Sequence, residues 1–403
     1  MHAKRYWDQR NPQTRRRSFP AFRGDTTADV VVIGGGLTGC TAAWVFAQAG
    51  LDVVLVEAER LASGSTAAGM GVLVPEPGAS YRDAEAAHGR RVARAAWQAT
   101  RRASLEFASA IRRAGIRCDL APAPLVINAR TGDRAAELRR EQAARRKAGL
   151  VTPWLVPAAV DAELGTDSAG ALRAREAFVL DPVRATLAIA QKAKARGARI
   201  FERSPVRRTT FTRKEARVVL ADGAIETSLV YVATGDPGRL FGQLRRHVRR
   251  QDAFAVVTEP LPTAMRRAVG RRAGVLTDDP ADPRWLRWLP DGRAMFAGAA
   301  GAPLAPRARD KAVVRHTAEL MYELSLRYPA ISGLPAGFGW DLPLTSTADG
   351  LPWIGAHRNF PFHFFAIALG WHGESLAWHA ARAALRAARG ESRKEDEVLG
   401  FGR

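Results

Sequence analysis

The first clear pattern of hydrophobic and polar positions lies close to the start of the chain. Residues 28–33 form an apolar, β-branched run with one aspartate, Asp29, which is typical of a buried parallel strand. Residues 37–50 then place apolar side chains at helical intervals and end on a glycine, and residues 52–56 form a second strand that is apolar after Asp52. This order predicts a strand, a helix and a second strand in direct succession.

The middle of the chain shows weaker but recognisable signals. Residues 83–114 and 133–147 have helical character, and the second of these segments is strongly basic. Asp181 followed by Pro182 predicts a helix that starts with an Asp cap and runs to Gly197. Short strands are expected after it, with a hairpin turn at Asp222-Gly223, over residues 198–202, 206–212, 217–220 and 226–233.

The last third of the chain ends on a strand, a glycine-rich turn and a helix. Residues 239–335 predict further strands and a helix, with aromatic residues concentrated at 284–288. Residues 364–369 then form an apolar strand that leads into Gly370-Trp371-His372-Gly373, and an alanine-rich helix follows and ends near Gly390. A strand, a glycine-rich turn and a helix at this position predict the completion of an interrupted domain.

Composition limits the class of protein. A chain of 403 residues that is 47% hydrophobic is long enough for two domains. Its two cysteines, Cys40 and Cys118, cannot supply a disulfide framework or a metal site, which favours a cytoplasmic location. No apolar stretch reaches the ~18 residues that a membrane span needs. The arginine-rich segment 14–19 lacks a following apolar region, so we interpret it as a basic lead rather than an export signal.

The net charge of +21 raises the possibility of a polyanionic partner. Basic clusters occur at 139–140, 145–147, 245–246 and 249–250. They are interpreted as solvated helix faces or as contacts to nucleic acid. Because the sequence has neither zinc-ligand spacing nor an aromatic RNA-stacking signature, nucleic acid is not the expected partner.

The glycines between the first strand and helix carry the first chemical signal. Gly34, Gly36 and Gly39 have G-x-G-x-x-G spacing, and Glu57 follows the second strand 18 positions after Gly39. Such glycines allow a tight turn and close approach to a pyrophosphate at the helix N-terminus, while the acid accepts from ribose hydroxyls. This context predicts a dinucleotide site, against the alternative of a glycine-rich turn without a ligand. The motif alone does not distinguish NAD from FAD.

Several further segments together resemble the D-amino acid oxidase family of FAD-dependent oxidoreductases, which includes glycine, sarcosine and γ-glutamylputrescine oxidases. The resemblance is carried by the G-x-G-x-x-G loop with Glu57, and by residues 64–70, 181–182, 206, 233–235, 349–352, 354–355 and 370–373. It implies FAD as the cofactor. It also implies non-covalent binding, because neither Cys40 nor Cys118 stands where sarcosine-oxidase-like enzymes carry their flavin-linked cysteine.

The predicted fold class is therefore α/β, with a Rossmann-like FAD-binding domain and an interleaved, sheet-containing α+β substrate domain. The FAD-binding domain is expected to consist of residues 28–77, 178–237 and 336–403, and the substrate domain of 78–177 and 238–335. Residues 1–27 form the basic N-terminal lead.

The resemblance also implies roles for individual residues. Ser65 and Thr66 would contact the phosphates or ribityl chain, Gly69-Met70 the flavin edge, and Val206 the adenine. Residues 370–374 would place a helix N-terminus at the pyrimidine edge, where it stabilises negative charge. The cofactor-binding residues implied in this way are Gly34, Gly35, Gly36, Leu37, Thr38, Gly39, Glu57, Ser65, Thr66, Gly69, Met70, Val206, Thr234, Gly235, Gly370, Trp371, His372, Gly373 and Glu374.

The implied reaction transfers hydride from the carbon next to an amine nitrogen to flavin N5, and the imine product then hydrolyses. The substrate is expected to be a small amine or amino acid, and the acceptor O2 or another oxidant. Arg287 is the candidate partner of a substrate carboxylate, with the alternative of an ordinary surface arginine. Trp371 and His372 are the other catalytic candidates, although His372 could instead cap or pack.

Some features leave alternatives open. The arginine that glycine-oxidase-like enzymes carry after the last strand is absent, because residues 369–372 read Leu-Gly-Trp-His. No lysine is placed obviously for oxygen activation, so an oxidase and a dehydrogenase are both compatible with the sequence. Two other functions remain: a tRNA-modifying flavoprotein with a basic surface, and the flavin subunit of a hetero-oligomeric dehydrogenase.

Overall fold

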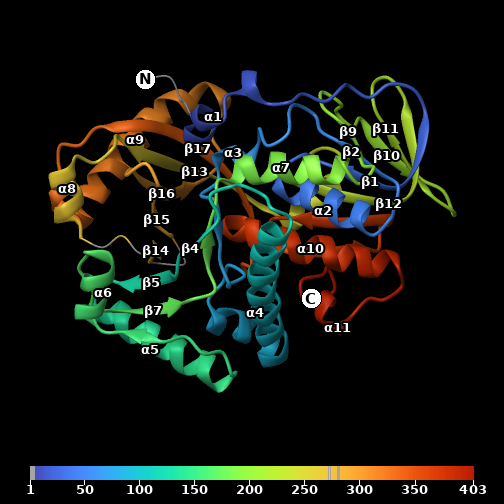
Figure 1. The fold of residues 1–403 in the computed structure, drawn as a ribbon. Coiled ribbons are helices and arrows are strands. Elements are labelled where there is room, and N and C mark those ends of the chain that lie inside the picture. Colours follow the sequence, from blue (N-terminus) through green and yellow to red (C-terminus); the bar gives the residue numbers. More distant parts are fainter. Residues whose placement is uncertain (1–4, 271, 273, 279–281) are drawn as a thin grey trace.

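A computed structural model describes residues 5–270, 272, 274–278 and 282–403. In the described part of the chain, two large sheets lie side by side, each with its own helices (Figure 1). The helices are α1 (Tyr6–Arg10), α2 (Leu37–Gln48), α3 (Ser65–Ala68), α4 (Tyr81–Arg113), α5 (Gly132–Lys147), α6 (Pro157–Leu164), α7 (Pro182–Lys194), α8 (Thr263–Ala268), α9 (Arg309–Arg327), α10 (Gly373–Ala388) and α11 (Lys394–Glu397), with short 3-10 helices η1 (Gln13–Arg15), η2 (Gly242–His247), η3 (Pro306–Ala308), η4 (Pro329–Ile331) and η5 (Gly370–His372).

The first sheet contains the strand–helix–strand unit that opens the chain. Its strands are β10 (Arg208–Phe211), β11 (Ala216–Val219), β12 (Ala224–Gly235), β1 (Thr26–Ile33), β2 (Val53–Val56) and β9 (Arg199–Phe201) in this order, with β19 (Phe360–Ile367) and β18 (Trp353–His357) added beside β12. β1 lies between β12 and β2 and is parallel to both. The parallel centre of the sheet confirms the expected nucleotide-binding architecture.

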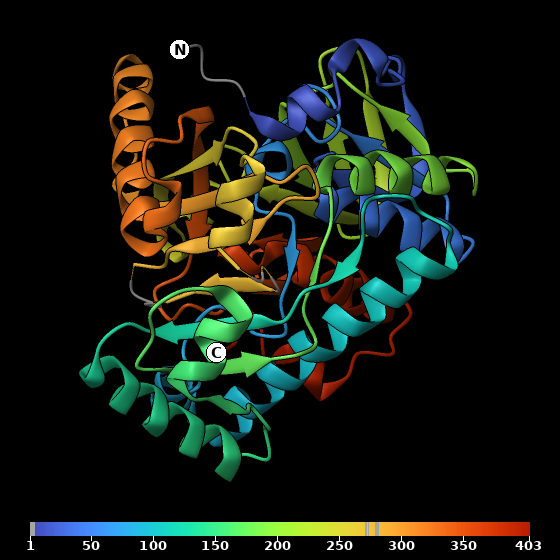
Figure 2. The same ribbon diagram turned by 60° about the vertical axis from the view of Figure 1, so that its left-hand side comes forward.

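The second sheet is mostly antiparallel. Its order is β17 (Ala336–Ser346), β13 (Arg249–Thr258), β16 (Ala294–Gly301), β15 (Trp285–Trp288), β14 (Val275–Thr277), β5 (Leu125–Ala129), β7 (Gly170–Ala174) and β6 (Trp154–Leu155). A small third sheet joins β3 (Val72–Leu73), β8 (Phe178–Val179) and β4 (Ala121–Pro122). Figure 2 shows α9 on the outer side of the second sheet, away from the first.

Helix starts follow the capping residues that the sequence provides. Asp181 accepts a hydrogen bond from the backbone N–H of Arg184 (3.0 Å) and so caps α7, with Pro182 as the first helical residue. Ser80 accepts from the N–H of Asp83 (3.1 Å) and caps α4. Within the described residues, no helix is long and apolar enough to cross a membrane.

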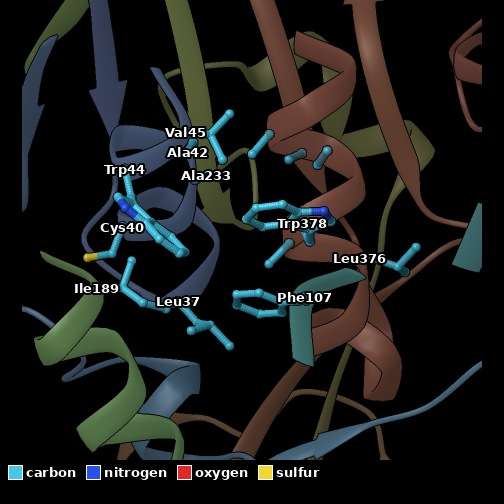
Figure 3. Packing of buried hydrophobic residues seen from close by; sticks show 14 of the residues in the cluster. Leu37, Cys40, Ala42, Trp44, Val45, Phe107, Ile189, Ala233, Leu376 and Trp378 are labelled. Atoms are coloured by element: carbon cyan, nitrogen blue, oxygen red, sulfur yellow. The ribbon is translucent and has the colours of Figure 1, made fainter. Parts of the chain in front are cut away.

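The core of the first half follows from the alternation along β1. Val30 and Val32 pack in one hydrophobic cluster with residues of α2, α7 and α10. Val31 and Ile33 point to the opposite face of the sheet, where they belong to a second cluster that includes residues of β11. Beyond these helices, the Trp378 ring of α10 stacks on Phe107 of α4 with ring centroids 5.7 Å apart (Figure 3). The long helix α4 is therefore anchored on the nucleotide-binding half.

The expected domain division differs from this arrangement at one segment. Residues 336–403 are expected in the nucleotide-binding half, but residues 336–346 form β17, which pairs antiparallel with β13 in the second sheet. Residues 78–177 are expected in the other half, and α4, the first helix of this range, packs on α10. The reason is long-range pairing, because β17 forms its backbone hydrogen bonds with β13 at the edge of the second sheet. The remaining boundaries stay a prediction.

An arginine with two carboxylates is buried where α5 meets the segment that precedes α4. The Arg145 guanidinium contacts Glu76 (2.6 Å) and Glu141 (2.8 Å), and all three side chains are buried. Burial opposes the charge on Arg145, but the carboxylates of Glu76 and Glu141 outweigh it and raise its pKa. Glu141 also accepts from the backbone N–H of Tyr81 (2.7 Å), so the network holds the first turn of α4.

Replacing this arginine tests the network. Because Arg145→Ala leaves two buried carboxylates without their cation, we expect the free energy of unfolding to fall by about 3–5 kcal/mol. Urea unfolding followed by circular dichroism measures the change. Arg146→Ala is the control, since Arg146 is exposed on the same helix and its loss is expected to change stability by less than about 0.5 kcal/mol. Equal effects in both variants would contradict a structural role for the network.

Candidate active site

A cavity of about 480 Å³ lies at the carboxyl ends of the central parallel strands. Ile33, Val56 and Gly235, the last residues of β1, β2 and β12, line it together with residues of β17 and the start of α10. This edge of a parallel sheet is where α/β folds bind ligands. Except for Gly39 and His372, every residue expected to bind the cofactor lines this single cavity.

The G-x-G-x-x-G glycines are required by close backbone packing. A Cβ on Gly39 would lie 1.9 Å from the carbonyl oxygen of Gly34, so only glycine lets α2 start so close to β1. Gly34 has a φ of +108°, and its Cβ would lie 2.6 Å from the carbonyl oxygen of Ala233 on β12. Gly36, in contrast, borders the cavity, and its Cβ would meet only the hydroxyl of Thr66, at 3.1 Å.

The start of α2 presents backbone donors to the cavity. Gly36 is its N-cap and therefore has no side chain with which to cap the helix. The Leu37 N–H donates to the Thr66 hydroxyl (3.0 Å), and Thr38 lines the cavity beyond it. An uncapped helix N-terminus beside a glycine turn fits the pyrophosphate of a dinucleotide such as FAD.

Glu57 stands at the end of β2, on the adjacent wall. Its carboxylate accepts from the backbone N–H groups of Gly35 (2.5 Å) and Glu59 (2.8 Å). Burial raises its pKa, although these two hydrogen bonds act in the opposite direction. A fixed acidic acceptor at this place fits the ribose hydroxyls of an adenosine.

The small-residue segment 68–71 is held by buried donors from three distant elements. The indole N–H of Trp340 in β17 donates to the carbonyl of Ala68 (3.0 Å), and that of Trp7 in α1 donates to Gly69 (2.9 Å). The guanidinium of Arg287 in β15 donates to the carbonyls that follow, those of residues 70 and 71, at 2.6 and 2.8 Å. These donors, which do not line the cavity, hold the backbone of the segment in place, and Gly69 and Met70 form part of the cavity wall.

Arg287 does not line the cavity. It is 2% exposed, and the same guanidinium nitrogen also donates to the carbonyl of Leu180 (3.0 Å). Burial lowers its pKa to about 10. Arg287 is therefore no surface arginine, and its placement behind segment 68–71 does not support the expected contact with a substrate carboxylate.

The second helix N-terminus at the cavity belongs to α10. No side chain caps it, and Gly370, Trp371, Gly373 and Glu374 line the cavity. His372 instead packs behind the wall, where its ring lies 5.5 Å from that of Trp285 and burial lowers its pKa to about 4. His372 is therefore neutral near pH 7, and this geometry favours the packing alternative.

Glu374 is the acidic side chain of this end of the cavity. Its Oε1 accepts from the backbone N–H of Gly71 (3.2 Å). Burial raises its pKa to about 7, against the opposing effects of its backbone hydrogen bonds and of the nearby Arg287 charge. Glu374 therefore joins the start of α10 to the segment that follows α3.

Sequence reasoning missed the residues that support the site from behind. Trp7 and Trp340 were not assigned a role, and neither were Leu342, Pro343, Leu344 and Thr345 of β17, which line the cavity. The sequence signal was slight: an early Tyr-Trp pair, and a strand that carries no recognisable cofactor motif. Neither cysteine lines the cavity, and no cluster of three or more potential metal ligands occurs among the described residues.

Comparison with known proteins agrees with this geometry. The family model DAO, "FAD dependent oxidoreductase", matches residues 29–386. The chain is 24% identical over 379 residues to a probable oxidoreductase (OrdL) of Haemophilus influenzae, covering 92% of this chain and 84% of that one. It is 25% identical over 343 residues to the γ-glutamylputrescine oxidoreductase of Escherichia coli, covering 84% and 78%.

Among solved structures, an L-proline dehydrogenase from P. horikoshii superposes with a TM-score of 0.77 at 19% identity, covering 94% of this chain and 97% of that one. At this identity the likeness concerns the fold alone, and it confirms the expected α/β class. The match to the family model extends over nearly the whole chain and includes both helix N-termini and Glu57. The chain therefore belongs to the DAO family of FAD-dependent oxidoreductases.

Proposed function

We propose that the cavity binds FAD non-covalently and that the protein oxidises the C–N bond of an amine or amino acid to an imine. The observation that carries this proposal is that two uncapped helix N-termini, those of α2 and α10, open onto one cavity that also holds Glu57. Helix N-termini stabilise a pyrophosphate and a reduced, anionic flavin ring. The names of the Escherichia coli relative and of the P. horikoshii structure support an amine or amino acid as substrate.

The cavity residues have distinct tasks in this proposal. Glu57 binds the adenosine ribose, Val206 borders the adenine, and Ser65 and Thr66 contact the phosphates or ribityl chain. Gly69-Met70 and residues 370–374 enclose the ring system. When bound, FAD supplies the hydride acceptor, and the chain binds and orients the substrate carbon against it.

The basic surface does not favour the nucleic-acid alternative. In the cluster 145–147, Arg145 is buried between Glu76 and Glu141 and is not available to a partner. In the cluster 139–140, the Arg139 guanidinium lies 3.7 Å from the centre of the Trp154 ring. Part of the positive charge thus has an intramolecular role.

The absorption spectrum of the purified protein tests the proposal directly. We expect an oxidised-flavin spectrum whose pigment is released by denaturation, and bleaching when amines or amino acids are added without air. Recovery of the colour on admitting air identifies O2 as an acceptor. A pigment that stays with the denatured chain would contradict non-covalent binding, and a colourless protein that cannot be reconstituted with FAD would overturn the proposal.

A substitution at Glu57 tests how the cofactor is oriented. Glu57→Gln removes the charge of the acceptor but keeps its shape, so we expect the dissociation constant of FAD to rise by about 10-fold. Titration of the apoprotein with FAD, followed by flavin fluorescence, measures it. Glu226→Gln, near the start of β12 and away from the cavity-lining Gly235 at its end, is the control and is expected to bind FAD like the wild type. Unchanged affinity in Glu57→Gln would place the adenosine elsewhere.

A substitution at Arg287 distinguishes a structural role of this side chain from recognition of a substrate carboxylate. Arg287→Met removes the donor that three backbone carbonyls share, although that of Gly71 still accepts from the Leu180 N–H, so we expect stability to fall by about 3 kcal/mol and FAD to bind more weakly. Thermal unfolding and FAD titration measure these effects, with the exposed Arg267→Met as control. If Arg287→Met instead kept full stability and FAD affinity and raised the KM of amino acids only, the expected carboxylate contact would be correct.

A further inference from the structure

The charges of the cavity wall contrast with those of the chain as a whole. The protein carries a formal net charge of +21, yet the described residues that line the cavity include no lysine, arginine or histidine. The ionisable side chains among them are three glutamates: Glu57, Glu59 and Glu374. A ligand carboxylate in this cavity would therefore meet no lining side chain of opposite charge from the described residues.

The end of the cavity proposed for the flavin and substrate is apolar except for one side chain. Met70, Leu342, Leu369 and Trp371 line the cavity here, and Glu374 is the ionisable residue beside them. Two glycines lie against this carboxylate. Its Oε1 accepts from the N–H of Gly71 (3.2 Å), and the same oxygen lies so close to Gly69 that a Cβ added there would be 3.0 Å from it. The carboxylate is thus held against the cavity wall in one place.

The carboxylate of Glu374 has no cationic partner among the described residues. It accepts hydrogen bonds from the backbone N–H groups of Gly71 and of Glu374 itself, and no ion pair within 4.0 Å is formed with it in the described part of the chain. Arg287 is the nearby cation, but its Nη1 donates to three backbone carbonyls and Arg287 does not line the cavity. A carboxylate in apolar surroundings is costly unless a cation joins it, and burial accordingly raises the pKa of Glu374 to about 7.

We propose that Glu374 binds the ammonium group of the substrate, and that the substrate is an amine without a carboxylate on the reacting carbon. This inference rests on the proposed function and narrows it, since the family includes enzymes for amino acids as well as for amines. An ammonium group would supply the cation that the Glu374 carboxylate lacks, and an apolar substituent would pack against Met70 and Trp371. A carboxylate on the same carbon would lie beside Glu374 and be repelled.

Two inert probes of nearly equal size separate the alternatives. tert-Butylamine and 2-aminoisobutyrate have no hydrogen on the carbon next to nitrogen, so the holoenzyme binds them without oxidising them. They differ in that a methyl group of the first is a carboxylate in the second. We expect calorimetric titration of the FAD-loaded protein to give at least about 10-fold tighter binding of tert-butylamine.

The variant Glu374→Gln identifies the residue responsible. The amide oxygen can still accept from Gly71, so the fold is expected to persist, and binding is compared per bound FAD, which is measured for each variant. On that basis tert-butylamine is expected to bind at least about 10-fold more weakly. Glu391→Gln, which is exposed beyond the end of α10, is the control with wild-type binding. If Glu374→Gln lost FAD, Glu374→Asp would serve in its place, with an intermediate loss expected because the charge stays but its reach shortens.

Each contrary outcome has a distinct meaning. Tighter binding of 2-aminoisobutyrate, binding of neither probe, or unchanged binding in Glu374→Gln would overturn this inference. A holoenzyme bleached by amino acids but not by amines would also overturn it while leaving the proposed function intact. A protein that holds no FAD would instead contradict the proposed function itself.

Discussion

The peptide carbonyls of segment 68–71 impose the constraint on which the site depends. This segment lies between the cavity and the second sheet, where buried carbonyl groups must find protein donors. The donors are Trp340, Trp7 and Arg287, and each belongs to a different element. One wall of the cavity is thus positioned by α1 and by two strands of the second sheet, so the two halves of the molecule are coupled at the site.

Pairing of buried arginines with backbone carbonyls and carboxylates also bears on the charge of the cavity. Several arginines of this basic chain are bound within the fold, and none lines the cavity among the described residues. Arg287 and Arg145 are buried and bind backbone carbonyls or carboxylates, so their charges are used within the fold. Arg403 similarly contacts Asp349 (2.8 Å) and lies 3.8 Å from the centre of the Trp353 ring. Burial opposes the charge of Asp349, but hydrogen bonds from Arg403 and Thr347 outweigh it and lower its pKa to about 2.

The sequence was sufficient where the determinants are local. The strand, glycine turn and helix of residues 28–50 and the cap at Asp181 depend on neighbours along the chain, and both were predicted correctly. The partners of Arg287 and the sheet of β17 depend on groups 78 or more positions away along the chain, which periodicity does not reveal. A buried arginine and a surface arginine look alike in a sequence, and the basic chain made the second interpretation plausible.

The cavity also illustrates why its two ends differ in how well a sequence reveals them. Its nucleotide end is built by β1, α2 and β2, which are adjacent in the chain and carry a recognisable spacing. Its other end exists because α10, from the last part of the chain, packs against α2 and places Glu374 at the N–H of Gly71, 303 positions away. In our proposal, cofactor binding therefore relies on local geometry that many sequences share, whereas substrate choice relies on side chains that are brought together from distant parts of the chain. That division lets one fold keep its cofactor while the residues around the reacting carbon change.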